Sequence, residues 1–389
     1  MRFAVLGAGL MGRAVIYDLA KALEVRSLIV GDFDVKRARA AARELGRSKA
    51  RAAFVDVRDL RQTAHLLRGV DVVVNCAQYD WNLHVMKAAL AAKAHYLDLG
   101  GLYHMTRRQP DLDAAFRRAG RLAIIGMGGA PGITNVMARA ASDGMERIES
   151  IHVYNACADQ QRYSAPLAHT FSIATILDEL TMPPVTFENA RFIEKELLSD
   201  PEQGKFPAPI GRITLRNSLH SELGTLPISF RKLGVREVRF KINYEPEFVS
   251  LVRGLTAIGL TRSKKVAVNG ATVAPRELLL ALLNQRPADK PARDVEALRV
   301  VVSGNREGRR QVVAMEAWTG HSVRPQFSAV ARDTGFPAAI GALMLARGEI
   351  RGTGVAAPEN IVPPQPFFHE LGKRGIRVRR WDPKSQPAH

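Results

Sequence analysis

Residues 1–15 read MRFAVLGAGLMGRAV, and this stretch decides the fold. A short apolar run leads into Gly7, Gly9 and Gly12, and a helical pattern follows. A G-x-G-x-x-G spacing between a strand and a helix is typical of dinucleotide-binding folds, because glycines allow a tight turn and let the backbone approach a pyrophosphate. We therefore expect the phosphates of a dinucleotide to lie against the N-terminus of a helix that begins at Leu10.

Asp32 is the acidic partner that such a loop requires, since it ends the second predicted strand about twenty residues further on. Its carboxylate can accept hydrogen bonds from both ribose hydroxyls of an adenosine and would repel a 2′-phosphate. NAD is therefore favoured over NADP, although Lys36 and Arg37 follow closely and keep NADP as the less favoured alternative. Because ligands bind beyond the carboxyl ends of parallel strands, the later strand ends supply further candidates. The residues expected to bind the cofactor are Gly7, Gly9, Leu10, Met11, Gly12, Asp32, Asp56, Val57, Asn75, Cys76 and Ala77.

Residues 1–127 alternate regularly between strand patterns and helix patterns, which is typical of a doubly wound parallel sheet. The run DVVVNCA at 71–77 is almost continuously apolar, as expected for a strand that is buried on both faces. We therefore predict the α/β class, with an N-terminal Rossmann domain. The predicted strands cover residues 2–8, 26–32, 51–57, 71–77, 95–100 and 121–127.

The pattern changes after GGAPGI at 128–133, where strand-like runs begin to mix with helical stretches. Residues 297–318 look like a hairpin that turns at Gly304–Asn305 or at Glu307–Gly308. The apolar helix predicted at 334–350 is expected to pack back on the first domain. We predict a Rossmann domain at 1–131, an α+β domain at 132–330 and a C-terminal segment at 331–389.

Composition narrows the class of protein further. The formal net charge of +18 invites a nucleic-acid interpretation, but the basic residues are scattered and lack interleaved aromatic residues, so most are expected on solvated faces. Only two cysteines, Cys76 and Cys157, are present, which excludes a disulfide framework and a cysteine-built zinc site. Histidine spacing shows no metal motif. With no signal-peptide or membrane-span pattern, we expect a soluble cytoplasmic protein without membrane contact.

Several motifs together resemble the saccharopine dehydrogenase-like superfamily, and within it the L-lysine 6-dehydrogenases. They occur in one order over nearly the whole chain: GAGLMGRAVIYDLAK (7–21), DVVVNCAQY (71–79), YLDLGGLYHMT (96–106), GGAPGITNVMA (128–138), HTFS (169–172) and DTGFPAAIGALMLARGEI (333–350). The resemblance implies that the α+β domain carries the substrate contacts and a dimerisation surface, and that the chain forms a homo-oligomer. It also implies NAD(P)-linked oxidation of a C–N bond in an amino acid, such as oxidative deamination of a terminal amine to an aldehyde with release of ammonia.

Two stretches depart from the family pattern. KINYEPEFV at 241–249 places Glu245 and Glu247 where relatives carry a neutral or basic stretch, and RNSLHSELGTLP at 216–227 matches only loosely. Both are expected on the substrate side, so the fold and cofactor carry over more firmly than the identity of the small amino-acid substrate.

Amine oxidation by hydride transfer needs a group that moves protons near neutral pH. His104 and His169 match histidine positions of the family, with structural roles as the alternative, and His104, which follows the fifth predicted strand, is expected at the mouth of the cleft. Asp98 ends the fifth predicted strand and either holds a catalytic water or an amine, or caps the turn that follows. Tyr79 follows the fourth strand and is expected to line the nicotinamide ring. Asn135, one turn into the helix predicted after APG, is expected to contact cofactor or substrate, and the weaker candidates are His220, Glu222 and Tyr244.

Two other functions remain open on the sequence. One is a reductase of the saccharopine or carboxynorspermidine type, which joins an amine to an aldehyde. The other is a Rossmann-fold NAD(H)-binding regulatory protein without turnover. Turnover of NAD with an amino acid alone, turnover only with amine and aldehyde together, and binding without turnover distinguish the three.

Overall fold

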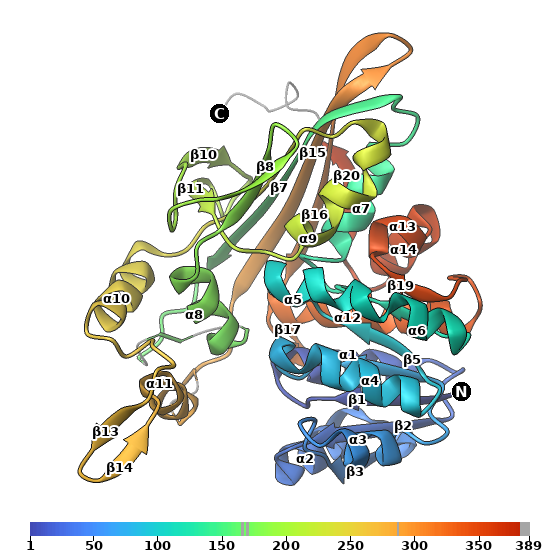
Figure 1. Cartoon of the computed structure of the whole chain (residues 1–389), viewed down its shortest axis with the longest axis vertical. Coiled ribbons are helices and arrows are strands. Elements are labelled where there is room, and N and C mark those ends of the chain that lie inside the picture. The colour runs from blue at the N-terminus through green and yellow to red at the C-terminus, as the bar shows by residue number, and fades with distance from the viewer. Residues whose placement is uncertain (165–166, 169–170, 286–287, 382–389) are drawn as a thin grey trace.

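Figure 1 shows a computed structural model of the chain, which describes residues 1–164, 167–168, 171–285 and 288–381. A parallel sheet with its helices forms the lower right of the view, and a large mixed sheet rises above it. The α8–α11 region lies to the left, with the β13–β14 hairpin at its lower end. This arrangement confirms the predicted α/β class with an N-terminal Rossmann domain and a second, mixed domain.

The Rossmann sheet has seven parallel strands in the order β19-β6-β5-β4-β1-β2-β3. Six of them correspond to the strands predicted from the sequence, and β19 joins from the far C-terminal part of the chain. The strands are β1 (Arg2–Leu6), β2 (Ser27–Asp32), β3 (Ala50–Phe54), β4 (Val72–Asn75), β5 (His95–Asp98), β6 (Leu122–Ile124) and β19 (Gly354–Ala356).

Helices cover both faces of this sheet, because successive strand residues point to opposite sides. Phe3 and Val5 of β1 pack in the cluster that contains α1, α2 and α12, whereas Ala4 and Leu6 pack with α4 and α6 on the other face. All four side chains are fully buried, as the near-continuous apolar strands predict. The helices of this domain are α1 (Leu10–Lys21), α2 (Val35–Leu45), α3 (Leu60–Leu66), α4 (Asn82–Ala91), α5 (Leu102–Arg108) and α6 (Asp113–Arg118).

The second sheet is mixed, with the order β10-β11-β12-β7-β15-β16-β20 and with β8 and β9 attached to β12. Its long hairpin turns at Glu307–Gly308, the second of the two predicted turns, where both residues have positive φ. The strands are β7 (Arg147–Asp159), β8 (Val185–Glu188), β9 (Arg191–Glu194), β10 (Glu202–Lys205), β11 (Arg212–Asn217), β12 (Glu237–Ile242), β15 (Asp294–Arg306), β16 (Arg309–Gly320) and β20 (Arg377–Trp381). Two small hairpins are β13 (Val266–Val268) with β14 (Ala271–Val273), and β17 (Ser322–Val323) with β18 (Gln326–Phe327).

The helices after residue 132 complete the molecule. α12 packs closely on α1, and it needs a glycine to do so, since a Cβ at Gly335 would lie 2.5 Å from the Cβ of Ala14. The helices are α7 (Ile133–Ala141), α8 (Ile173–Thr181), α9 (Glu222–Ser229), α10 (Pro246–Ala257), α11 (Pro275–Asn284), α12 (Ala329–Ala346), α13 (Pro358–Ile361) and α14 (Pro364–Lys373).

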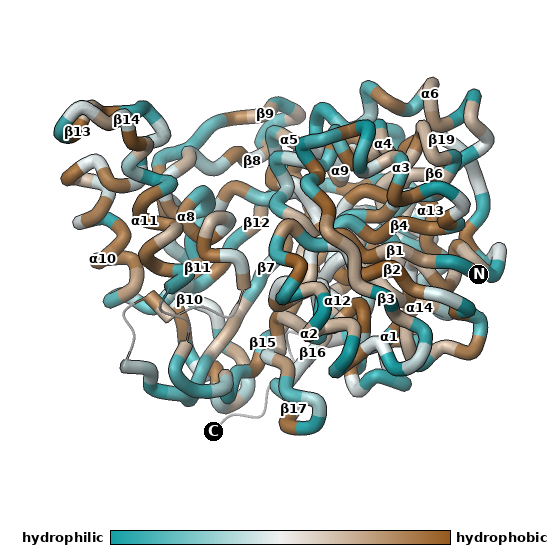
Figure 2. The backbone as a smooth tube through the Cα atoms, turned by 90° about the horizontal axis from the view of Figure 1, so that it is seen from below, coloured by the Kyte–Doolittle hydropathy of each residue, from teal (hydrophilic) through white to brown (hydrophobic). Residues whose placement is uncertain are grey.

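The C-terminal segment contacts both domains. α12 and β19 lie with the Rossmann sheet, as expected for the segment from residue 331, but β20 instead pairs with β16 of the mixed sheet. The reason is edge pairing: β16 offers an unpaired edge, and β20 covers it. Figure 2 shows hydrophobic residues gathered around β1, β2 and β4 and hydrophilic residues on the outer loops. Within the described ranges, no helix is long and apolar enough to cross a membrane.

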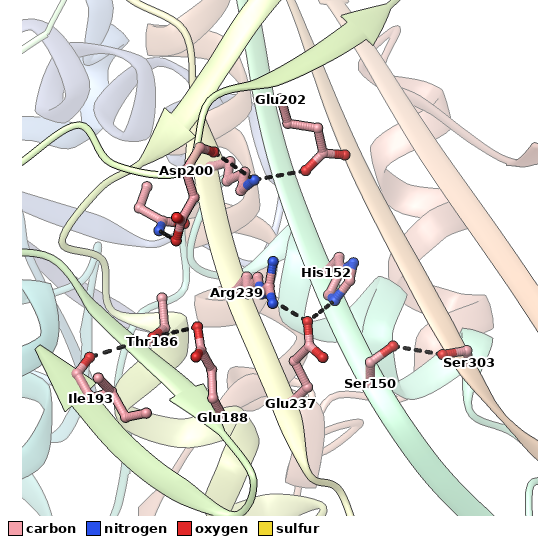
Figure 3. Close-up of polar contacts among 12 residues, drawn as sticks. Ser150, His152, Thr186, Glu188, Ile193, Asp200, Glu202, Glu237, Arg239 and Ser303 are labelled. Carbon is pink, nitrogen blue, oxygen red and sulfur yellow. Dashed lines mark hydrogen bonds and ion pairs between the residues drawn. The ribbon is translucent and has the colours of Figure 1, made fainter. Parts of the chain in front are cut away.

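Polar side chains join β7, β12 and β15 across one face of the mixed sheet (Figure 3). Nε2 of His152 and Nε of Arg239 lie 2.8 and 2.7 Å from the same Glu237 oxygen. The hydroxyls of Ser150 and Ser303 are 2.6 Å apart. Side chains alternate along a strand, so the residues between these polar ones point to the opposite face of the sheet. On that face, Asn155 and Cys157 of β7 line the cavity between the two domains.

Candidate active site

A large cavity of about 2070 Å³ separates the two domains. Its Rossmann wall is the glycine loop with the ends of β2 and β4, and its opposite wall comes from β7, α8, β15 and the segment after β12. The carboxyl ends of the parallel strands therefore open into this cavity, which is where ligands bind in such folds.

The glycine loop has the geometry of a phosphate cradle. Gly7 has φ +100° and passes so close to Cys76 that a Cβ would lie 2.6 Å from the Cys76 carbonyl carbon. A Cβ at Gly12 would lie 1.9 Å from the Gly7 carbonyl oxygen, so Gly12 lets α1 pack against the loop. A Cβ at Gly9 would meet nothing within 4 Å, and Gly9, Leu10 and Met11 line the cavity. No side chain caps the N-terminus of α1, so its amide groups face open space that suits a pyrophosphate.

Asp32 lies at the end of β2 and lines the cavity beside this loop. Its carboxylate accepts hydrogen bonds from the amides of Ala8, at 2.7 Å, and Asp34, at 2.8 Å. Asp32 thus shapes the loop, and the remaining lone pairs of its carboxylate are free for a ribose. Sequence reasoning did not foresee the shaping role.

The other cofactor candidates divide into two groups. Asp56, Val57, Cys76 and Ala77 line the cavity as expected, and Asp56 forms an ion pair of 2.6 Å with Arg58. Asn75 requires a correction, because its side chain is 1% exposed, lies outside the cavity and donates to Asn82 Oδ1 at 2.9 Å. Its own Oδ1 accepts from the amide of Ala77 at 3.3 Å, so it holds the cofactor-facing turn from behind.

Asp98 is the cap of the turn that follows β5, which is one of the two roles expected for it. Its carboxylate is 1% exposed and accepts from the amides of Gly100 and Gly126, the hydroxyl of Tyr96 and the amide of Gln109. Burial raises the pKa of Asp98 to about 6, against the lowering effect of these donors. The alternative role, a catalytic carboxylate in the cleft, is wrong in position because Asp98 lies behind the cavity wall.

The remaining predicted catalytic residues are placed differently from one another. Tyr79 lines the cavity, and its hydroxyl donates to Asp178 at 2.7 Å. His104 is exposed and lies outside the cavity, which corrects its expected place at the cleft mouth. The reason is that Leu102 and Met105 turn the buried face of α5 inward. His169 lies outside the described residues.

His220 stands at the centre of the polar network in the cavity wall. Its ring stacks flat on Phe240, with centroids 3.7 Å apart, and its Nδ1 hydrogen-bonds to the fully buried carboxylate of Glu222. Glu222 also accepts from the Thr134 hydroxyl at 2.8 Å. Nε2 of His220 lies 4.0 Å from Glu179 Oε1. His220 therefore has one nitrogen fixed by a buried acid while the residue lines the cavity.

The protonation states of this network are set by opposing effects. Burial alone would lower the pKa of His220, but the carboxylates of Glu222 and Glu179 raise it above its usual value. Burial raises the pKa of Glu179 to about 7, while His220 and the hydrogen bond from Tyr244 lower it. An imidazole with a raised pKa beside a carboxyl whose pKa is about 7 is suited to move protons.

Comparison with known proteins agrees with this architecture. The profile of the saccharopine dehydrogenase NADP-binding domain matches residues 3–124, and that of the saccharopine dehydrogenase C-terminal domain matches residues 128–376. The chain belongs to the saccharopine dehydrogenase family. It is accordingly an oxidoreductase with an N-terminal domain that binds a nicotinamide cofactor, and the first profile covers the whole glycine loop and Asp32.

Individual relatives of this saccharopine dehydrogenase family member have low sequence identity to it, although they align over most of the chain. Carboxyaminopropylagmatine dehydrogenase of Synechocystis is 25% identical, over 96% of this chain and 95% of its own length. Carboxynorspermidine synthase of Vibrio cholerae is 23% identical, over 86% of this chain and 83% of its own length. Apo saccharopine dehydrogenase (L-Glu forming) of Saccharomyces cerevisiae has the same fold, with a TM-score of 0.73 and 19% identity over 98% of this chain and 100% of that one.

The structure brings together several residues that sequence reasoning ranked low or missed. His220, Glu222 and Tyr244 were weaker candidates, whereas Glu179 and Glu296 were not singled out, although both line the cavity. A signal for Glu179 is present in ILDELT at 176–181, where an acid falls among apolar residues on a helix. The glutamate of DVEALRVVV at 294–302 gives a similar signal in a strand. A buried acid on an apolar face needs a partner, and that is a mark of a site.

Proposed function

We propose that this protein is an NAD(H)-dependent enzyme that joins a cationic amine to a carbonyl compound by reductive C–N bond formation, or runs the reverse reaction. The observation that carries the proposal is the His220–Glu222 pair in the wall of a cavity that opens from a dinucleotide loop. The proposal extends the family assignment to a substrate class and a reaction direction.

The cofactor site fits a dinucleotide on two observations. The space in front of Gly9 is open, and the first turn of α1 offers uncapped amides to a pyrophosphate. Asp32 at the end of β2 favours a free ribose 2′-hydroxyl and hence NAD. When bound, the nicotinamide supplies the hydride for reduction of a C=N bond or accepts it in the reverse direction.

His220 is suited to the proton steps. Addition of a neutral amine to an aldehyde gives a carbinolamine, and loss of water from it requires a proton at the hydroxyl oxygen. With Nδ1 held by Glu222, His220 can donate that proton from Nε2, and water leaves with the C–O electron pair. In the hydrolytic direction the same nitrogen accepts a proton from the attacking water.

Acidic residues in the cavity support a cationic substrate. The chain carries a net charge of +18, yet the cavity wall opposite the cofactor loop, here called the substrate wall, is rich in carboxylates. A diamine or polyamine would be attracted to such a wall and repelled by much of the remaining surface. Arg162 and Lys290 also line the cavity and offer cations for a substrate carboxylate. The acidic lining residues beyond the cofactor loop are Asp159, Glu179, Glu245, Glu247, Asp289 and Glu296.

The names of the relatives support the same class. Carboxyaminopropylagmatine dehydrogenase and carboxynorspermidine synthase are both named for carboxylated amine compounds. Oxidative deamination of a terminal amine, as in L-lysine 6-dehydrogenase, is the second candidate, because the same acidic wall suits the side-chain ammonium of a diamino acid.

One assay decides between these candidates. The purified protein is mixed with NADH, a diamine and a carboxylate-bearing aldehyde, singly and in combination, and absorbance of NADH is followed. The proposed function predicts NADH oxidation only when amine and aldehyde are both present. NADH production from NAD and a diamino acid alone would favour the deaminase. Tight NADH binding with no turnover in any combination would favour the regulatory alternative.

A further inference from the structure

Glu296 and Asp333 are two buried carboxyl groups that meet where the two domains join. Glu296 lies on the inner face of β15, is 4% exposed and lines the cavity. Asp333 lies in the first turns of α12, is 1% exposed and does not line the cavity. The two carboxyl groups are neighbours, since each contributes to the pKa shift of the other.

No basic side chain forms an ion pair with this carboxyl pair in the part of the chain that the structure describes. Glu296 Oε2 and both Asp333 oxygens accept no hydrogen bond from a backbone amide or a basic side chain there. The charged neighbours are Asp294 on β15, Arg332 on α12 and His220. The guanidinium of Arg332 donates to the carbonyl oxygens of Gly320 and Arg374, and its charge lowers the pKa of Asp333 without forming an ion pair with it. A buried acid that lacks such partners is costly unless a ligand supplies one.

The two carboxyls take different protonation states. Burial, reinforced by Glu296, raises the pKa of Asp333 well above its usual value, which favours the protonated form of Asp333. Burial raises the pKa of Glu296 to about 7, although the hydrogen bond from Asp333 lowers it. Above neutral pH the pair therefore carries one negative charge, and it is on the member that faces the cavity.

Asn155 supplies a second unsatisfied acceptor beside Glu296. It lies on β7, two residues from Cys157, the residue that pairs with Glu296, so it is on the same face of the sheet as Glu296. Asn155 lines the cavity, and its buried Oδ1 has no hydrogen-bond partner among the described residues. An ammonium group has three N–H donors and a positive charge, which suits one carboxylate oxygen and one amide oxygen together.

We infer that Glu296 and Asn155 form an ammonium-binding subsite for the amine substrate, with Asp333 as a protonated positioning residue that orients the Glu296 carboxylate. The inference rests on the proposed function for the identity of its ligand, a diamine or polyamine. It assigns the amine to the wall formed by β7 and β15 and leaves His220 for the carbonyl oxygen of the second substrate.

The test measures binding of propane-1,3-diamine to the full chain by calorimetry at pH 8 and pH 6, without turnover. Wild type should bind the diamine at pH 8. Glu296→Gln should raise the Kd about tenfold at pH 8 and about twofold or less at pH 6, because Glu296 is largely protonated at pH 6 in wild type as well. Glu296→Asp keeps the carboxylate, so, as in wild type, this variant should bind the diamine more tightly at pH 8 than at pH 6. Asp333→Asn still donates a hydrogen bond to Glu296 and should stay within about threefold of wild type at pH 8.

Glu149→Gln is the matched control, since it removes one half-exposed carboxylate of β7 that does not line the cavity, and it should leave the Kd unchanged. Thermal unfolding and NADH binding check that each variant is folded. Equal diamine affinity in wild type and Glu296→Gln at both pH values, or no diamine binding by wild type, overturns the subsite. Loss of binding in Asp333→Asn overturns the assigned role of Asp333. Binding that depends on Glu296 without turnover of any amine would instead refute the proposed function and leave the subsite standing.

Discussion

Nδ1 of His220 hydrogen-bonds to the carboxylate of Glu222, a side chain with no exposed surface. This contact fixes the ring and places the proton on Nδ1 in the neutral form, so Nε2 is the nitrogen that exchanges protons. Asp32 anchors the cofactor loop on the Rossmann side of the same cavity. The two sites face one cavity but belong to different domains, and only the fold brings them together.

Replacing His220 by Asn should reduce kcat about 100-fold or more, because general acid–base groups typically contribute that much. NADH affinity should stay within about twofold, since His220 lies on the substrate wall. Steady-state kinetics with NADH, amine and aldehyde measure the first effect, and fluorescence titration measures the second. His104→Asn is the control with unchanged kcat, as His104 is exposed on α5. A His220→Asn variant with the kcat of wild type would rule out the assigned role.

The raised pKa of His220 also predicts how stability depends on pH. Because the folded pKa exceeds the unfolded value of about 6.5, protonated His220 stabilises the fold below that pH, and the stabilisation is lost as pH rises through the folded pKa. The free energy of unfolding should therefore differ more between wild type and His220→Asn at pH 6 than at pH 9. Urea unfolding at both pH values tests this, and a difference that grows with pH would contradict it. His104→Asn should show no such dependence.

The Rossmann domain could be predicted because its signals are local. Gly7, Gly9 and Gly12 lie within one short loop of the sequence, and a short apolar run predicts each strand. β19 could not be predicted in the same way. It is only three residues long and takes its place through pairing with β6, more than 200 positions away in the chain.

The residues around His220 on the substrate wall could be predicted less well, because their properties depend on contacts between distant parts of the chain. His220 acquires its properties from Glu222, two residues away, and from Glu179 and Phe240, which lie on other elements. Family-like motifs favoured His104 instead, and the phase of α5 turns that residue outward. The sequence reveals residue types and spacing, whereas the pKa of a side chain depends on neighbours that the tertiary fold supplies.

Two glycine variants separate packing from cofactor binding in the loop. Gly12→Ala should lower the free energy of unfolding by about 1–3 kcal/mol, because its Cβ would overlap the Gly7 carbonyl oxygen at 1.9 Å. Gly9→Ala should fold normally, since its Cβ meets no protein atom within 4 Å, but should weaken NADH binding by intruding on the pyrophosphate space. Thermal unfolding and NADH titration of both variants provide the test. Full NADH affinity in Gly9→Ala would show that the pyrophosphate lies elsewhere.

Asp98→Asn should destabilise the protein by about 2 kcal/mol or more. The Asp98 carboxylate accepts hydrogen bonds from Gly100, Gly126, Tyr96 and Gln109. In Asp98→Asn the NH2 group of the side chain would face some of these donors and could not accept from them, so at least one buried donor would lose its partner. Urea unfolding measures the loss at pH 8, where Asp98 is ionised because its pKa is about 6. The cost should shrink towards pH 5, where the wild-type carboxyl is protonated. Unchanged stability at pH 8 would contradict the turn-capping role.

Asp32→Ser tests the cofactor preference and also the second role of this side chain. Removal of the carboxylate should lower the ratio of NADH to NADPH efficiency at least tenfold, because repulsion of the 2′-phosphate is relieved and contacts to the ribose hydroxyls are lost. It should also lower the thermal stability, since the amides of Ala8 and Asp34 lose their charged acceptor. Asp34→Ser is the control: Asp34 caps α2 without lining the cavity, so it should affect stability alone. If Asp32→Ser loses stability but keeps the cofactor ratio, the carboxylate shapes the loop and does not select the ribose.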